Sequence, residues 1–119
     1  MPRSLTMWGN NPWDNDRASD WFANLMHLTH FPDQIRATLL LCEQEDACGE
    51  NTTLLRAAVY CALQFCRVHI WPIEHLDSDL ELAIKATHKV LSDENYCYSE
   101  KTTAQIQAEL RELELRRKI

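Results

Sequence analysis

The chain has 119 residues and a formal net charge of −6, with only two glycines and four prolines. So few turn-forming residues disfavour β-hairpins, and the ordinary apolar content excludes a disordered chain. The acidic balance opposes binding to nucleic-acid phosphates and favours a basic protein partner. We therefore expect one all-α domain over residues 1–119, with about five helices.

The first helix is expected over residues 15–28. Asn10, Asn11 and Pro12 form a turn before it, and Asp14 or Asn15 supplies the N-cap. The apolar residues that follow at helical spacing predict one buried stripe, made of Ala18, Trp21, Phe22, Leu25 and Met26.

The start of the chain resembles a bacterial domain family of unknown function, which opens with a Trp-Gly pair, an Asn-Asp pair and an Asp-Trp pair on its first helix. The matching residues are Trp8, Gly9, Asn15, Asp16, Ala18, Asp20 and Trp21. Residues 82–91 also resemble the Ala-rich penultimate helix of that family. Residues 96–99 depart from it, because they lack the family's tryptophan before the last helix. The resemblance implies a series of helices, and its signature is structural: a turn, a cap and core aromatic residues.

A second helix is expected over residues 32–43, because Pro32 fits the first turn of a helix. An acidic loop follows over residues 43–50. Residues 51–70 then form a helix whose only charged residues after Leu54 are Arg56 and Arg67. A helix that is apolar nearly all round belongs in the middle of a bundle, so we expect the other helices to pack around it.

Pro72 is expected to end the central helix, which leaves Trp71 in an extended loop. Ser78 and Glu81 have the spacing of a capping box, which predicts a fourth helix from about residue 78 to 91. The last helix is expected from Ser99 or Thr102 towards residue 118, with an apolar stripe of Ile106, Leu110 and Leu113.

The five cysteines include no CxxC pair, and no secretory segment is expected at the start of the chain. These features predict reduced thiols and a cytoplasmic protein. We expect no cofactor, no metal and no membrane association.

No pattern predicts catalysis, so we expect a protein that is not an enzyme. His27 and His30 could share a metal, but the sequence offers no obvious third ligand. The acids Asp14, Asp16 and Asp20 are better explained by capping and by the dipole of the first helix. A nucleophilic Cys66 or Cys97 would need an electropositive setting, and acids surround Cys97.

The expected function is binding of a basic protein, and more specifically immunity-type neutralisation of a nuclease-like bacterial toxin by occlusion. The acids and one aromatic residue expected at the interface are Glu43, Glu45, Asp46, Glu50, Trp71, Asp77, Asp79 and Glu81. Two alternatives stay open. One is a homo-oligomer that uses the last helix as its seam, and the other is a metal-dependent enzyme built on His27 and His30. The sequence leaves the oligomeric state open.

Overall fold

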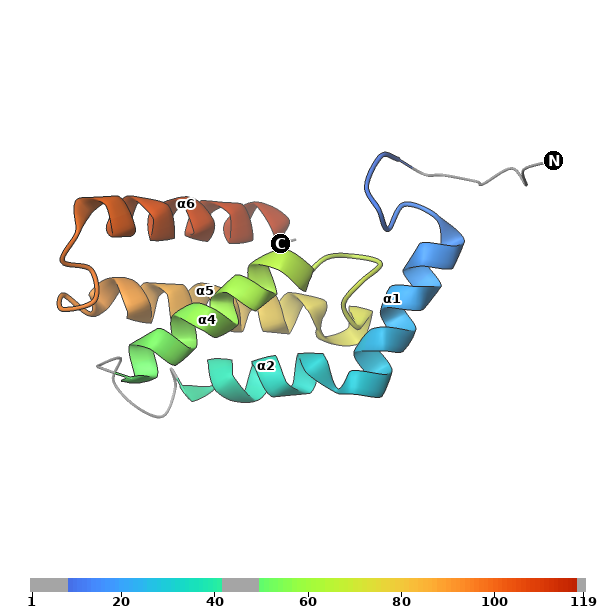
Figure 1. Cartoon of the computed structure of the whole chain (residues 1–119), viewed down its shortest axis with the longest axis horizontal. Coiled ribbons are helices and arrows are strands. Elements are labelled where there is room, and N and C mark those ends of the chain that lie inside the picture. The colour runs from blue at the N-terminus through green and yellow to red at the C-terminus, as the bar shows by residue number, and fades with distance from the viewer. Residues whose placement is uncertain (1–8, 42–49, 118–119) are drawn as a thin grey trace.

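The computed structural model describes residues 9–41 and 50–117, which form five helices and confirm the all-α prediction (Figure 1). The helices are α1 (Asp16–Thr29), α2 (Phe31–Leu39), α4 (Glu50–Phe65), α5 (Ile73–Ser92) and α6 (Glu100–Arg116). Helices α2, α5 and α6 lie along the long axis of the molecule, α4 runs obliquely to them, and α1 crosses one end at a steep angle.

The core lies between α4 and α5, which share the most extensive helix–helix contact. Helix α4 also contacts α2 and α6, so the prediction of a central helix is confirmed. Burying a large aliphatic side chain contributes about 1.5–3 kcal/mol, so each such residue in this cluster stabilises the fold. Its buried members on these two helices include Leu55, Val59, Ala62, Leu63, Leu80, Ala83, Ile84 and Val90.

Helix α4 is shorter than predicted and is not covered on every side. It ends at Phe65 rather than at residue 70, and residues 66–72 form a loop in which His69 has a left-handed backbone, with φ of 76°. This loop turns Ile70 and Trp71 back into the core. Leu54 and Tyr60 face solvent, and they are 50% and 56% exposed. The apolar residues of α4 therefore extend over more of the helix surface than the neighbouring helices cover.

Helix α5 begins earlier than predicted, at Ile73, and the capping box was wrong. Pro72 is its N-cap residue, and its φ of −53° suits a chain about to enter a helix. Ser78 is already inside the helix, where its hydroxyl donates to the carbonyl of His75 at 3.2 Å.

Helix α6 packs on α5 and keeps its apolar stripe inside the domain. It begins at Glu100, within the predicted range, and the Ser99 side chain caps it by accepting from the Thr102 amide at 3.5 Å. Ile106 and Leu113 are fully buried in the domain's own core. This buried stripe is therefore not available as an oligomer seam, and the alternative of a homo-oligomer through α6 stays an untested prediction.

Helix α1 is attached more lightly than the other helices. Among the described helices it contacts α2, to which it is joined at His30, a residue with φ of 55°. The Asn15 side chain accepts from the Ala18 amide at 2.9 Å, which confirms the predicted cap. Of the predicted stripe, Met26 is buried, but Trp21 and Leu25 are exposed, so the stripe as a whole does not face the core.

Within residues 9–41 and 50–117, the structure contains no helix that combines the length and the apolar character needed to span a bilayer.

Candidate functional site

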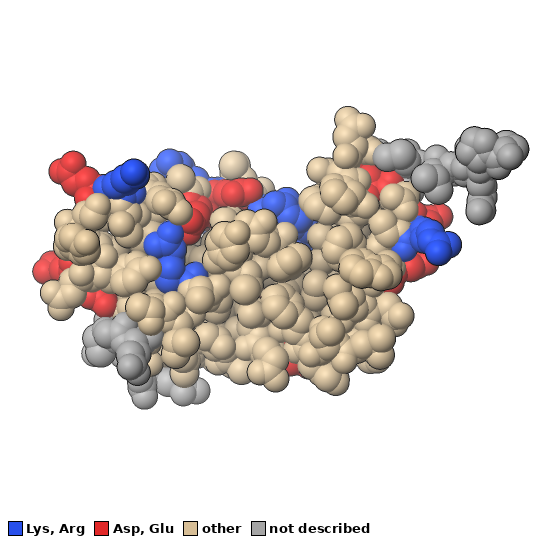
Figure 2. Space-filling view, in the orientation of Figure 1, with Lys and Arg blue, Asp and Glu red and all other residues tan. Residues whose placement is uncertain are grey.

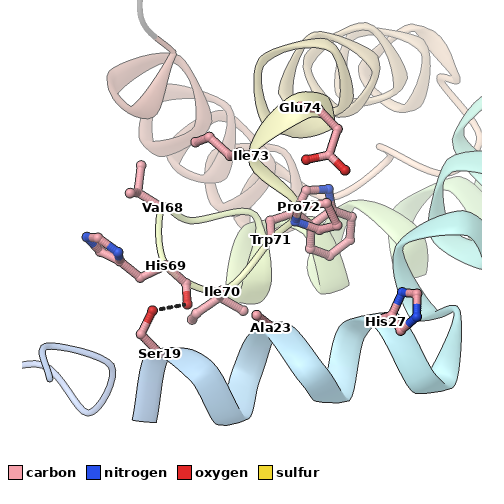
Figure 3. Close-up of a pocket in the computed structure, with 10 residues that line it drawn as sticks. All are labelled: Ser19, Ala23, His27, Val68, His69, Ile70, Trp71, Pro72, Ile73 and Glu74. Atoms are coloured by element: carbon pink, nitrogen blue, oxygen red, sulfur yellow. Dashed lines mark hydrogen bonds between the residues drawn. The ribbon is translucent and has the colours of Figure 1, made fainter. Parts of the chain in front are cut away.

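A cleft lies between α1 and the segment that leads into α5 (Figure 3). It encloses a cavity of about 530 Å³. One wall comes from α1 and the other from residues 68–74. The lining residues are Ser19, Ala23, His27, Val68, His69, Ile70, Trp71, Pro72, Ile73 and Glu74. The two walls are joined where the Ser19 hydroxyl donates to the carbonyl of His69 at 3.3 Å.

The shape of the second wall follows from the loop after α4. The amides of Ile70 and Trp71 both donate to the carbonyl of Arg67, at 3.1 and 3.0 Å. This tight turn directs Ile70 and Trp71 inwards, while Val68 and Ile73 remain on the surface. The cleft therefore has an apolar rim above a buried floor.

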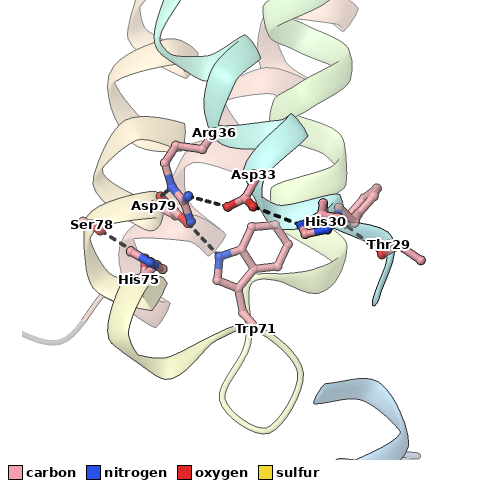
Figure 4. Close-up of polar contacts among 9 residues, drawn as sticks. Thr29, His30, Asp33, Arg36, Trp71, His75, Ser78 and Asp79 are labelled. Atoms are coloured by element: carbon pink, nitrogen blue, oxygen red, sulfur yellow. Dashed lines mark hydrogen bonds and ion pairs between the residues drawn. The ribbon is translucent and has the colours of Figure 1, made fainter. Parts of the chain in front are cut away.

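The floor is fixed by Trp71 and Asp79, which are 3% and 1% exposed. The indole nitrogen of Trp71 donates to Asp79 Oδ2 at 2.8 Å (Figure 4). Arg36 of α2 donates to both carboxylate oxygens of Asp79, also at 2.8 Å. The expectation that Trp71 and Asp79 face a partner was therefore wrong, because both groups are satisfied inside the protein.

The same arginine continues the network towards the surface. Arg36 Nη1 donates to Asp33 Oδ1 at 2.9 Å, and His30 lies 3.5 Å from the other oxygen of Asp33. The hydrogen bond with Asp79 raises the pKa of Arg36, while the hydrogen bond from Arg36 lowers the pKa of Asp33. This chain of contacts links the junction of α1 and α2 to the floor of the cleft.

Acidic residues flank the cleft on both sides. On α5, Glu74, Asp77 and Glu81 follow the spacing i, i+3, i+7, which places them along one side of the helix. Glu74 lines the cavity, is exposed, and has no hydrogen bond or ion pair with a described residue. Glu81 accepts from Arg117 Nη1 at 2.7 Å, so its charge is partly balanced.

The α1 wall carries the second acidic flank. Asp16 and Asp20 are exposed and continue at helical spacing into Ala23 and His27, which line the cavity.

Sequence reasoning proposed Asp77 and Glu81 but missed Glu74. The i, i+3, i+7 spacing of the three acids indicates one helix face. It was not recognised because α5 was expected to begin at Ser78, which left Glu74 and Asp77 outside the helix.

The remaining predicted interface residues fall where the structure gives no side-chain information. Glu43, Glu45 and Asp46 lie outside the described residues. Glu50 opens α4, but its side chain is outside the description.

The family-signature residues have mixed outcomes. Trp8 lies outside the described residues. A Cβ atom at Gly9 would lie 2.5 Å from Asp14 Oδ2, so a larger residue here would displace the carboxylate that accepts from the Asn11 amide at 2.8 Å. Asn15 has its predicted structural role as the cap of α1. Trp21, which was expected in the core, is 60% exposed.

The described residues add no third ligand to the proposed His27–His30 metal site and do not activate the Cys66 thiol. His27 lines the cleft, whereas His30 pairs with Asp33. Among the described residues, no three His, Cys, Asp or Glu side chains gather as a metal site would require. Burial raises the pKa of Cys66 to about 12, which keeps its thiol protonated at neutral pH.

The sequence matches no family model, and neither a curated protein nor a solved structure was found to be similar to it. The resemblance of the opening segment therefore stays a prediction, and the function must be argued from the cleft itself.

Proposed function

We propose that this domain is a cytoplasmic protein-binding domain that receives a basic segment of its partner in the cleft between α1 and α5. The observation that carries this proposal is the position of Glu74. Its carboxylate lies on an otherwise largely apolar wall and has no ion pair with a described residue. A carboxylate in that setting favours a cation that brings its own apolar surface.

A lysine or arginine side chain has this combination of properties. Its methylene stem packs on apolar side chains while its charged end stays polar. In the cleft, Ala23, Pro72 and Ile73 would contact the stem, and Glu74 would accept hydrogen bonds from the charged end. Asp77 and the two α1 acids would raise the association rate more than the affinity, because exposed pairs are screened by water and salt.

The immunity-type role is the specific form of this proposal. A nuclease-like toxin presents basic side chains to bind phosphates. An acidic domain seated on that surface would exclude the nucleic acid by steric and electrostatic occlusion. The net charge of −6 supports such a partner in preference to an acidic one.

The direct test uses a synthetic amphipathic peptide with one arginine between apolar residues, titrated into the isotopically labelled protein. We expect chemical-shift changes along residues 68–74 and on the Ser19, Ala23 and His27 side of α1. Shifts confined to other surfaces would contradict the proposal.

Charge reversal supplies the matched comparison. Glu74→Lys should abolish peptide binding, whereas Glu100→Lys should leave it unchanged. Both acids are exposed and both lie in the first turn of a helix, so the two variants match in net charge and in helix-dipole effect. Equal losses in the two variants would mean that binding depends on net charge alone.

The natural partner can be sought by co-expression with the product of the neighbouring gene. If the two proteins co-purify, Glu74→Lys should release the partner at lower salt than Glu100→Lys does. Release at the same salt concentration would show that the partner binds elsewhere.

A further inference from the structure

The exposed side of α1 carries an apolar stripe. Trp21, Leu25 and Leu28 follow the spacing i, i+4, i+7 and are 60%, 36% and 69% exposed. Water-exposed apolar groups in a continuous row mark a contact surface more often than isolated ones do. Helical geometry places this stripe on the opposite flank of α1 from Ser19, Ala23 and His27, so it is separate from the cleft.

The stripe borders a small apolar pocket. The pocket has a volume of about 230 Å³, and its lining is almost wholly apolar. It is formed where α1, α2 and the end of α4 meet. The lining residues are Leu25, Met26, Thr29, Phe31 and Phe65. The Phe31 and Phe65 rings pack edge to face with centroids 5.6 Å apart, which fixes one wall. The pocket has room for one aromatic side chain.

Charge decides which occupant fits this surface. No Asp, Glu, Lys or Arg occurs from Trp21 to Pro32, and Figure 2 shows hardly any charged side chain over the junction of α1 and α2. A basic partner finds no carboxylate there. A second copy of this acidic chain would be repelled at most of its other surfaces, but it meets no like charge at this one.

The stripe is also self-complementary. If two α1 helices cross antiparallel about a twofold axis at Leu25, residues equally far from Leu25 on either side come opposite each other. Trp21 lies four positions before Leu25, and Thr29 lies four positions after it. Trp21 of one copy therefore meets the pocket of the other copy, and the same contact is made in return, as a twofold interface requires.

We propose that this protein forms a homodimer through α1, with the Trp21 side chain of each copy seated in the Leu25–Thr29–Phe31 pocket of the other. One helix seam lies at the low end of specific interface sizes, below about 1,200 Å². The dimer is therefore reversible, and each copy keeps its own core.

Sedimentation of the full chain over a wide concentration range tests the association. We expect the mass to rise from 13.9 kDa towards twice that value. Trp21→Glu should weaken the dimer at least about tenfold, because a central tryptophan is a typical hot spot. Leu115→Glu, at a position 86% exposed on α6, should dimerise like the unmodified chain. A monomer at every concentration, or equal weakening by the two variants, would overturn the proposal.

A cross-link tests the register. Under mild oxidation Leu25→Cys should form a disulfide-linked dimer, because residue 25 meets itself at the axis. Leu115→Cys and the unmodified chain, with its own cysteines, set the background. A dimer in sedimentation without this cross-link would overturn the antiparallel arrangement. Glu74→Lys should leave dimerisation unchanged, which separates this proposal from binding in the cleft.

Discussion

Arg36 of α2 holds Asp79 of α5 through two hydrogen bonds of 2.8 Å, and the carboxylate has almost no exposure to water. This pair stabilises the floor of the cleft, since Asp79 also accepts the hydrogen bond that fixes Trp71. The acidic flanks lie at the surface, whereas this acid is part of the scaffold.

Removing the carboxylate should therefore destabilise the fold. Asp79→Ala leaves Arg36 and the Trp71 indole without their partner, and breaking a buried ion pair costs about 3–5 kcal/mol. Urea unfolding monitored by circular dichroism measures this loss. Asp33→Ala is the control, because Asp33 is exposed and its ion pair with Arg36 joins two residues one turn apart on the same helix. A loss no larger than that of the control would show that the pair does not support the domain.

The α6 stripe gives a second stability prediction. Ile106 is fully buried, so Ile106→Ala should cost about 2–5 kcal/mol through lost packing and a residual cavity. Leu115 belongs to the same helix but is 86% exposed, so Leu115→Ala should stay within about 0.5 kcal/mol of the unmodified protein. Thermal unfolding of both variants checks this difference. Similar costs would contradict the placement of α6.

Asp93 should make stability depend on acid pH. It accepts from the Thr52 hydroxyl at 2.6 Å and from the amides of Asn95 and Tyr96. The Thr52 hydrogen bond is the main cause that lowers the pKa of Asp93 below its usual 3.8, and the two amides add to it. The ionised carboxylate therefore stabilises the fold above pH 3.8, and this contribution is lost as the pH falls through the lowered pKa.

Asp93→Asn should consequently be less stable than the unmodified protein at pH 7, and the difference should shrink as the pH falls below 3.8. Unfolding curves at neutral and acid pH measure both values. Asp20→Asn, at an exposed position on α1, controls for the loss of one charge. A difference that stays constant with pH would rule out this role for Asp93.

Cys66 should resist alkylation in the folded protein. Burial is the main cause that raises its pKa to about 12, and the Asp79 carboxylate adds to it, so the reactive thiolate is scarce at pH 8. Iodoacetamide labelling followed by peptide mass spectrometry should modify Cys66 only after unfolding. Rapid labelling of Cys66 in the native protein would contradict its burial.

Local sequence signals predicted the helices and the cap of α1. Asn15 precedes α1 at capping distance and its cap forms as expected, whereas Ser99, expected only as a possible start of the last helix, caps α6 in the same way. Such contacts join residues three positions apart, so the sequence shows them directly. The start of α5 was misplaced because Pro72 was taken only as a helix terminator, although proline also suits the entry to a helix.

The long-range contacts could not be predicted. Asp79 and Arg36 are 43 positions apart, so nothing in the local pattern distinguishes Asp79 from the exposed Asp77 beside it. Trp21 illustrates the same limit. Helical spacing showed that Trp21 and Met26 belong to one broad apolar surface, but the steep crossing of α1 decides that only Met26 is covered.

The central claim is that the Glu74 carboxylate receives a basic side chain in the cleft. The most direct measurement is the affinity of the single-arginine peptide for Glu74→Lys and for Glu100→Lys, compared at equal salt concentration. We predict that Glu74→Lys loses binding while Glu100→Lys keeps the affinity of the unmodified protein. Retained binding by Glu74→Lys, or an equal loss in both variants, would contradict the claim.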